Sequence, residues 1–178
     1  GTSGGKSKFI PITADSLRIN HYPGASDSVA GYMRLVPNSR IFSGKGLILG
    51  GSFANELGLD NRRVKVGDLS ANLIDRINPI VNLMRVPSKR IALMADWEKK
   101  LPALIEASIG QNITNISGVP SWFLTLLRGV MQKAHVDRIS DVWPNLEVFF
   151  HGGISFEPYR DEYKRITENF AFICDKEL

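Results

Sequence analysis

The sequence predicts an α/β fold with a largely parallel sheet flanked by helices. One observation is that strand-like and helix-like segments alternate in the second half of the chain, since strands separated by helices usually pair in parallel. Another is that glycines directly follow two of these strand candidates, at the sheet edge where ligands bind. The 178 residues, 43% of them hydrophobic, are enough to bury a substantial core.

Residues 1–87 form a part rich in loops and strands. The segment KFIPI is typical of a short extended piece, and Thr13 then caps a brief helix. The range 21–60 is rich in Gly, Pro, Ser and Asn, so we expect little helix there. Its clear strand candidate is GLILGG, residues 46–51, and a helical piece is expected over 71–77.

Residues 88–178 alternate helix and strand within what we expect to be one single piece, 1–178, of a domain. Apolar residues at spacings of three and four from Trp97 to Ile105 predict an amphipathic helix, which we expect Pro102 to split in two. Further strands and helices are then predicted in turn over NITNISG, VPSWFLTLLRGVMQKA, LEVFFHGG (146–153), PYRDEYKRI and FAFIC (170–174).

Composition excludes several classes of function. The net charge of +4 is spread without a basic block, so we expect no nucleic-acid partner. Cys174 is the only cysteine and the three histidines lie far apart, so we expect no metal held by protein ligands alone and a cytoplasmic location. No apolar run approaches the ~20 residues of a membrane span, so we expect no membrane partner. The oligomeric state stays open.

The opening GTSGGKSK allows three interpretations. Gly5, Lys6 and Ser7 match the end of a Walker loop, but Pro11 lies where that motif needs a helix. Glycine and serine at a chain end are also typical of a flexible linker or tag. In the third interpretation, backbone amides and the hydroxyls of Thr2 and Ser3 face triphosphate oxygens from a loop between two strands.

Other candidates also have two interpretations. HGG, residues 151–153, fits an oxyanion-hole element of a hydrolase, but the chain has no G-x-S-x-G nucleophile motif. Trp122 and Phe123 are either core residues or ligand contacts. Asp68 is either a catalytic acid or, as is usual for such a residue, part of a turn with a helix cap. His151 is either a residue of the functional site or a satisfied histidine at a strand end. Basic residues are expected on a solvated face, namely Arg85, Lys89 and Arg90.

Segments far apart in the chain share one resemblance. GTSGGKSKFIPIT resembles the first nucleotide-binding motif of the Gretchen Hagen auxin-responsive family of acyl-acid amido synthetases, which belongs to the adenylate-forming superfamily. GKGL at 44–47 looks like a strand entry of that family, and DVWPNLEVFFHGG at 141–153 is similar to its WPN segment and the following strand and loop. The resemblance implies part of the N-terminal domain of an adenylate-forming enzyme.

The resemblance also implies a reaction. A carboxylic acid would attack the α-phosphate of ATP, with Mg²⁺ on the triphosphate, and an amino acid would then displace AMP. An acyl-CoA ligase of the same superfamily, or a non-catalytic domain that binds a small acid or a partner, stays open as an alternative. The motif positions put the phosphate loop at Thr2, Ser3, Gly4, Gly5 and Lys8, and the adenine and acyl loop at Gly152, Gly153 and Ile154.

A weaker assignment places the acyl pocket near Leu69, Ser70, Val119 and Trp122. The resemblance assigns no catalytic residue. The acidic second motif, the aspartate of the third motif and the mobile C-terminal domain of the family are absent from these residues. We therefore expect an internal fragment of a longer protein, which binds ATP weakly or not at all and is inactive by itself.

Overall fold

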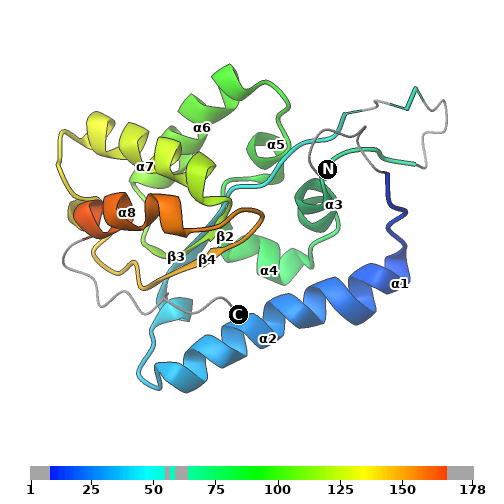
Figure 1. Cartoon of the computed structure of the whole chain (residues 1–178), viewed down its shortest axis with the longest axis horizontal. Helices are drawn as coiled ribbons and strands as arrows, with labels where there is room; N and C mark the ends of the chain where they lie inside the picture. Colours follow the sequence, from blue (N-terminus) through cyan, green and yellow to red (C-terminus); the bar gives the residue numbers. More distant parts are fainter. Residues whose placement is uncertain (1–8, 55–56, 59–63, 168–178) are drawn as a thin grey trace. The chain divides into compact units, whose positions relative to one another are not determined.

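A computed structural model describes residues 9–54, 57–58 and 64–167 (Figure 1). The chain divides into two compact units, Gly1–Asn38 and Ser39–Leu178. None of the helices in the described part of the chain combines the length and the apolar character that a membrane span requires.

The described part of the first unit is helical from Ala14 to Leu35. Thr13 caps α1 (Ala14–Ser16) through a reciprocal pair of hydrogen bonds with Ser16, which confirms the predicted cap. The chain continues through a π-helical stretch, η1 (Leu17–His21), into α2 (Tyr22–Leu35). The prediction of little helix over 21–60 is therefore wrong for α2.

Local chemistry explains α2. Pro23 lies in its first turn, where the missing N–H would have no helical partner. The hydroxyls of Ser26 and Ser28 donate to the carbonyl oxygens four residues before them, at 3.0 Å each. The residues that suggested a loop are thus compatible with a helix at these positions.

The described residues of the second unit form a four-stranded sheet in the order β2-β1-β3-β4. Its strands are β1 (Lys45–Ile48), β2 (Arg85–Val86), β3 (Ile113–Gly118) and β4 (Val148–His151). Every pair is parallel, which confirms the predicted α/β fold with a largely parallel sheet. The predicted strands at 46–51, 112–118 and 146–153 are confirmed as β1, β3 and β4. The two-residue β2 was not predicted, and the strand predicted over 170–174 lies outside the described residues.

Helices connect these strands. Between β1 and β2 lie α3 (Leu69–Asp75) and α4 (Pro79–Leu83), and between β2 and β3 lie α5 (Lys89–Ala92) and α6 (Trp97–Ile109). After β3 comes α7 (Pro120–Ala134), and after β4 comes α8 (Arg160–Ile166). Short 3₁₀ turns complete the unit: η2 (Ile41–Ser43), η3 (Ile139–Asp141) and η4 (Glu157–Tyr159).

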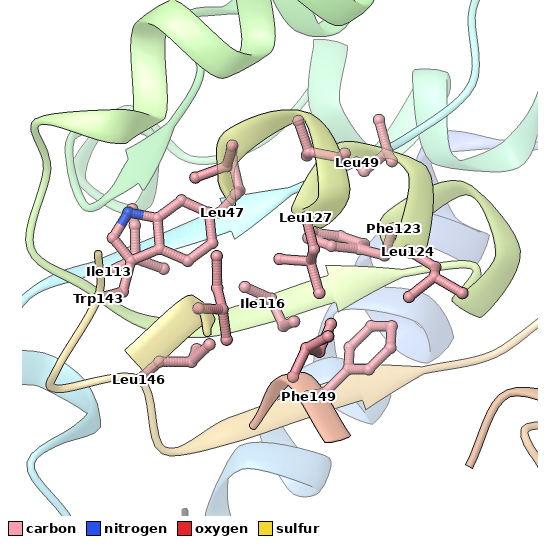
Figure 2. Packing of buried hydrophobic residues seen from close by; sticks show 14 of the residues in the cluster. Leu47, Leu49, Ile113, Ile116, Phe123, Leu124, Leu127, Trp143, Leu146 and Phe149 are labelled. Atoms are coloured by element: carbon pink, nitrogen blue, oxygen red, sulfur yellow. The ribbon is translucent and has the colours of Figure 1, made fainter. Parts of the chain in front are cut away.

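One face of the sheet packs against α6, α7 and α8. Leu47, Ile116 and Phe149 are neighbours across β1, β3 and β4, and all three are buried. Figure 2 shows them packed against side chains of α7 such as Phe123 and Leu127, which are also fully buried. This cluster is the core that fixes the strand ends in place.

The WPN segment contributes to this core. Trp143 is fully buried, and its indole N–H donates to the carbonyl oxygen of Ser108 at the end of α6, at 3.2 Å. The Asn145 side-chain amide donates to the Oδ1 of Asn112, just before β3, at 3.0 Å. The segment that carried part of the family resemblance therefore has a structural role.

Two predictions about single residues are wrong. Pro102 lies inside α6, which runs unbroken from Trp97 to Ile109. The buried Leu104 keeps the second half of the helix on the core. Arg85 was expected on a solvated face, but it is 5% exposed. Its Nη1 donates to the carbonyl oxygen of Pro87 at 2.7 Å, and its Nε and Nη2 have no hydrogen-bond partner among the described residues.

Candidate functional site

The order of the strands defines one special edge of the sheet. From β1 the chain moves to β2 on one side, whereas from β3 it moves to β4 on the other side. In open parallel sheets, ligands bind beyond the carboxyl ends of two such strands. The turns that follow β1 and β3, together with the neighbouring end of β4, are therefore the candidate site.

The turn after β1 contains Gly50 and Gly51 and is fixed by the start of α3. The backbone N–H of Gly51 donates to the Oγ of Ser70 at 2.8 Å, and the backbone N–H of Ser52 donates to the Oδ2 of Asp68 at 3.1 Å. A Cβ atom at Gly51 would overlap the Asp68 carboxylate. Position 51 therefore needs a glycine, because the turn approaches this carboxylate so closely.

Lys100 contacts the same turn from α6. Its ammonium group donates to the carbonyl oxygen of Gly50 at 2.7 Å and to that of Gly51 at 3.4 Å. The residue is only 3% exposed. Burial lowers the pKa of the Lys100 ammonium below its usual value, and the charge of Asp68 counters part of this shift. A buried positive charge thus lies at the end of β1.

The ends of β3 and β4 meet beside this turn. The backbone N–H of Leu49 donates to the carbonyl oxygen of Ser117 at 3.0 Å. A Cβ at Gly118 would lie 2.7 Å from the carbonyl oxygen of Leu49, and one at Gly153 would lie 3.3 Å from a methyl group of Val119. Gly153 also has a φ of +85°, which favours glycine. Three strand ends therefore approach one another through glycines.

A tryptophan pair borders this edge. Trp122, in the first turn of α7, is 50% exposed, so it is not a core residue, whereas its neighbour Phe123 is. The rings of Trp122 and Trp97, from the first turn of α6, meet edge to face with centroids 4.7 Å apart. Trp97 lies three residues before Lys100, so α6 contacts both Trp122 and the turn after β1.

His151 ends β4 within an aromatic cluster. Its ring stacks on that of Phe156 with centroids 4.6 Å apart, and it meets Phe149 at 5.6 Å. Phe149 in turn contacts Tyr163 of α8. His151 is thus a strand-end residue packed among aromatic rings, and it leads directly into Gly152.

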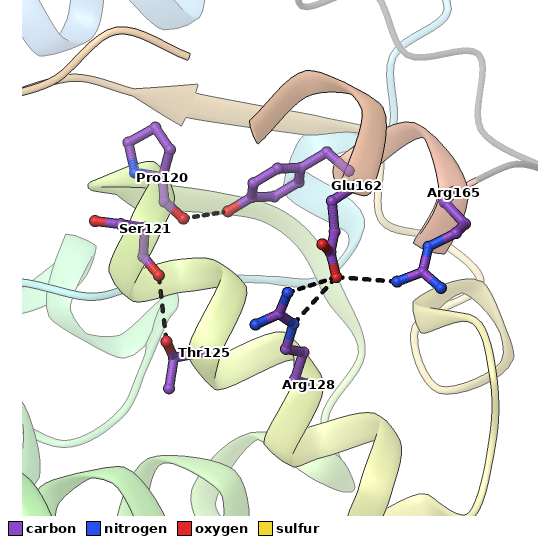
Figure 3. A network of polar contacts seen from close by, with 7 residues as sticks. Pro120, Ser121, Thr125, Arg128, Glu162 and Arg165 are labelled. Carbon is purple, nitrogen blue, oxygen red and sulfur yellow. Dashed lines mark hydrogen bonds and ion pairs between the residues drawn. The ribbon is translucent and has the colours of Figure 1, made fainter. Parts of the chain in front are cut away.

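Helix α8 is attached to the start of α7 (Figure 3). The Tyr163 hydroxyl donates to the carbonyl oxygen of Pro120 at 2.8 Å. About two turns further along α7, Arg128 pairs with Glu162 at 2.8 Å, and Glu162 also pairs with Arg165 at 3.0 Å. These contacts fix the junction of β3 and α7, where Val119 faces Gly153.

The predicted site residues are distributed as follows. Val119, Gly152 and Gly153 come together at the ends of β3 and β4, where the backbone N–H of Gly152 approaches the carbonyl oxygen of Gly118 at 3.4 Å. Ser70 contacts the end of β1 instead. Two exposed apolar residues, Leu69 (41%) and Ile154 (43%), directly neighbour Ser70 and Gly153 in the chain. The phosphate-loop residues lie outside the described residues: Thr2, Ser3, Gly4, Gly5 and Lys8.

Sequence reasoning missed Gly51, Asp68 and Lys100 as parts of this site. The glycines of GLILGG follow a strand directly, which is the same signal that identified Gly118 and Gly152. Asp68 precedes α3 as expected of a turn residue, yet its carboxylate accepts from Ser52 and forms no side-chain cap of the helix. In the described part of the chain, no group of three or more His, Cys, Asp or Glu side chains could hold a metal ion.

Comparison with known proteins gives one match. Residues 57–172, more than half of the chain, match the family model described as the GH3 family N-terminal domain. No curated protein and no solved structure matches the chain. The matched range includes α3 to α8 and the ends of β3 and β4.

Proposed function

The chain belongs to the GH3 family, and we propose that the protein activates a carboxylic acid with ATP and transfers the acyl group to an amino acid. Members of this family are adenylate-forming acid–amino acid ligases. The structural observation that carries the proposal is the meeting of three glycine-bearing strand ends at the switch point of a parallel sheet. This is the edge where α/β folds bind nucleotides.

The proposed chemistry has two steps. An oxygen of the acid's carboxylate attacks the α-phosphorus of ATP, the bond to the β-phosphate oxygen breaks, and pyrophosphate leaves. The amine of the acceptor then attacks the acyl carbon, loses a proton, and displaces AMP. The first step needs in-line positioning and charge stabilisation and no general base.

We assign the nucleotide to two loops, made of Thr2, Ser3, Gly4, Gly5 and Lys8 and of Gly152, Gly153 and Ile154. The Gly152 position is open, since a Cβ there would meet nothing within 4 Å, so a ligand can approach its backbone. For the acyl group we assign Leu69, Ser70, Val119 and Trp122. The exposed ring of Trp122, steadied by Trp97, is an apolar contact of the kind that a hydrophobic acid requires.

Mg²⁺ would neutralise part of the triphosphate charge. Mg²⁺ is commonly held by substrate phosphates and one or two carboxylates and needs no cage of protein ligands. This fits the described residues, which offer no group of three metal-binding side chains. We further propose that the protein works in the cytoplasm, since its single cysteine suits a reducing compartment.

The test is exchange of labelled pyrophosphate into ATP by the full-length protein, over a panel of aliphatic and aromatic acids. We expect exchange that depends on one class of acid. Gly152→Val should lower it at least about tenfold, because a branched side chain would block approach to the loop. Gly110→Val is the matched control, because Gly110 also has no neighbour within 4 Å of a Cβ and lies at the end of α6.

The outcomes separate the alternatives. Formation of AMP with an amino acid supports the proposal, whereas formation of AMP only with coenzyme A indicates an acyl-CoA ligase. Binding of an acid with no exchange for any acid indicates a non-catalytic binding domain. An equal loss of pyrophosphate exchange in the Gly110 and Gly152 variants would contradict the assignment of the nucleotide to the Gly152–Gly153 loop.

A further inference from the structure

We propose that Lys100 is a positioning residue for acid activation, which holds the Gly50–Gly51 turn at the switch point in its working position. The inference rests on the proposed function for its meaning. Its evidence is the contacts of Lys100 with Gly50 and Gly51. The family resemblance assigns no role to any of these three residues.

The turn is held from both sides. From α6, the Lys100 ammonium donates to the carbonyl oxygens of Gly50 and Gly51. From the start of α3, Ser70 accepts from the Gly51 N–H and Asp68 accepts from the Ser52 N–H. Donors and acceptors of three consecutive residues are therefore used, and the path of the turn is fixed.

The turn also packs closely against its neighbours, with no room for a side chain at either glycine. A Cβ at Gly51 would overlap Asp68, and one at Gly50 would lie 2.7 Å from Ile74 and 3.1 Å from Ser70. The next strand is equally close, since Gly118 approaches the carbonyl oxygen of Leu49. Displacement of the turn would therefore displace the ends of β1 and β3 together.

A charged residue at this position needs an explanation. Burial of an ammonium group is unfavourable, and a side chain such as methionine fills similar space without that cost. The acceptors of Lys100 are the carbonyl oxygens of two glycines that are themselves only partly buried. The fold alone therefore has little need of this charge, whereas a fixed turn beside a reacting group benefits from it.

Lys100→Met tests the inference in the full-length protein, with Lys99→Met as the matched control. Lys99 is adjacent, mostly exposed, and pairs with Asp96 on the surface. We expect Lys100→Met to lower kcat of pyrophosphate exchange at least about tenfold, with KM for ATP within about threefold of the parent. Lys100→Arg, which keeps the charge, should recover most of the loss, and Lys99→Met should change neither parameter.

A merely structural lysine gives a different pattern. It would lower the melting temperature of Lys100→Met by more than about 4 °C and leave kcat per folded molecule unchanged. That result overturns the inference, as does a Lys100→Arg variant no more active than Lys100→Met.

A second readout needs no activity. Hydrogen exchange of the Gly51 and Ser52 amides should become at least about tenfold faster in Lys100→Met, because the turn is then no longer held against Ser70 and Asp68, which accept from these amides. The exchange rates should stay unchanged in Lys99→Met. If the parent protein exchanges no pyrophosphate with any acid, the proposed function fails and this measurement still decides the role of Lys100 in the turn. Unchanged amide exchange in Lys100→Met would show that the lysine does not hold the Gly50–Gly51 turn.

Discussion

Tyr163 combines two roles at the junction of α7 and α8. Its ring packs against Phe149 and Phe156, and its hydroxyl donates to the carbonyl oxygen of Pro120. Burial raises the pKa of the Tyr163 hydroxyl well above its usual value. The residue therefore links the aromatic cluster at the end of β4 to the start of α7.

We expect Tyr163→Phe to lower the free energy of unfolding by about 1–2 kcal/mol at pH 7, because the Pro120 carbonyl loses its donor. Unfolding in urea measures this loss of stability.

The stability of the parent protein should also depend on pH through Tyr163, because the folded-state pKa of Tyr163 is raised above the unfolded value of 10.0. The contribution of Tyr163 to the free energy of unfolding is thus fully present below pH 10 and decreases as the pH rises above that value. Tyr159→Phe should keep most of the alkaline loss of the parent protein, because burial is the larger cause of the raised pKa of Tyr163 and the charge of Tyr159 the smaller one. A Tyr163→Phe variant that shows the same loss as the parent would contradict this account.

Neighbouring residues show what a pattern can predict at this scale. Lys99 and Lys100 are indistinguishable by composition, yet one is exposed and the other buried. Helical spacing distinguishes them, since Lys100 lies three residues after Trp97 and four before Leu104, on the apolar stripe of α6. Arg85 had no such signal, because a two-residue strand is too short for a periodicity of two to appear.

At the scale of elements, the end of α7 is unusual. His135 follows the helix with a φ of 56° in the left-handed region, where glycine is favoured. Its backbone N–H approaches the carbonyl oxygens of Met131 and Gln132 and helps to end the helix. The chain therefore uses a strained, exposed residue to turn toward β4.

We expect His135→Gly to raise the free energy of unfolding by about 0.5–1 kcal/mol, because glycine adopts this conformation without steric cost. Gln132→Gly, three residues earlier and still inside α7, should lower it by a similar amount. Chemical denaturation of both variants tests the pair. A loss of stability in both variants would show that the conformation of His135 carries no strain.

Periodicity predicted β3, β4 and α7 well. The buried strands β3 and β4 and the amphipathic α7 have strong patterns and were predicted close to their observed bounds. By contrast, α2 was missed because serine, glycine and proline suggest loops unless their place within the helix is known. The meeting of Gly153 with Val119 depends on the order of strands, which no local pattern contains.

At the scale of the whole molecule, the chain consists of two compact units. The second unit begins with its own anchor, because the hydroxyl of Ser39 and the backbone N–H of Arg40 both donate to the carboxylate of Glu147, at 2.6 Å each. This carboxylate precedes β4 directly. The first residues of the second unit are thus attached to the start of β4 within that unit.

We expect brief digestion with a nonspecific protease to cut first between α2 and Ser39, at residues 36–38, and to leave a resistant product that begins near Ser39. Mass measurement of the product and sequencing of its new end locate the cut. Digestion of the urea-unfolded chain provides the control, with no preferred site. A resistant product that keeps α2 would contradict the division into two units.

The pairing of β1 has a consequence for protein synthesis. Gly46 pairs with Arg85 on one side and with Asn115 on the other, so both partners of this central strand leave the ribosome after it. Until β3 has emerged, β1 has only the two residues of β2 to pair with, and the side chains of β3, α7 and β4 that complete its core are still missing. The nascent chain therefore folds late, and truncated products that end before residue 118 should depend on chaperones to remain unaggregated.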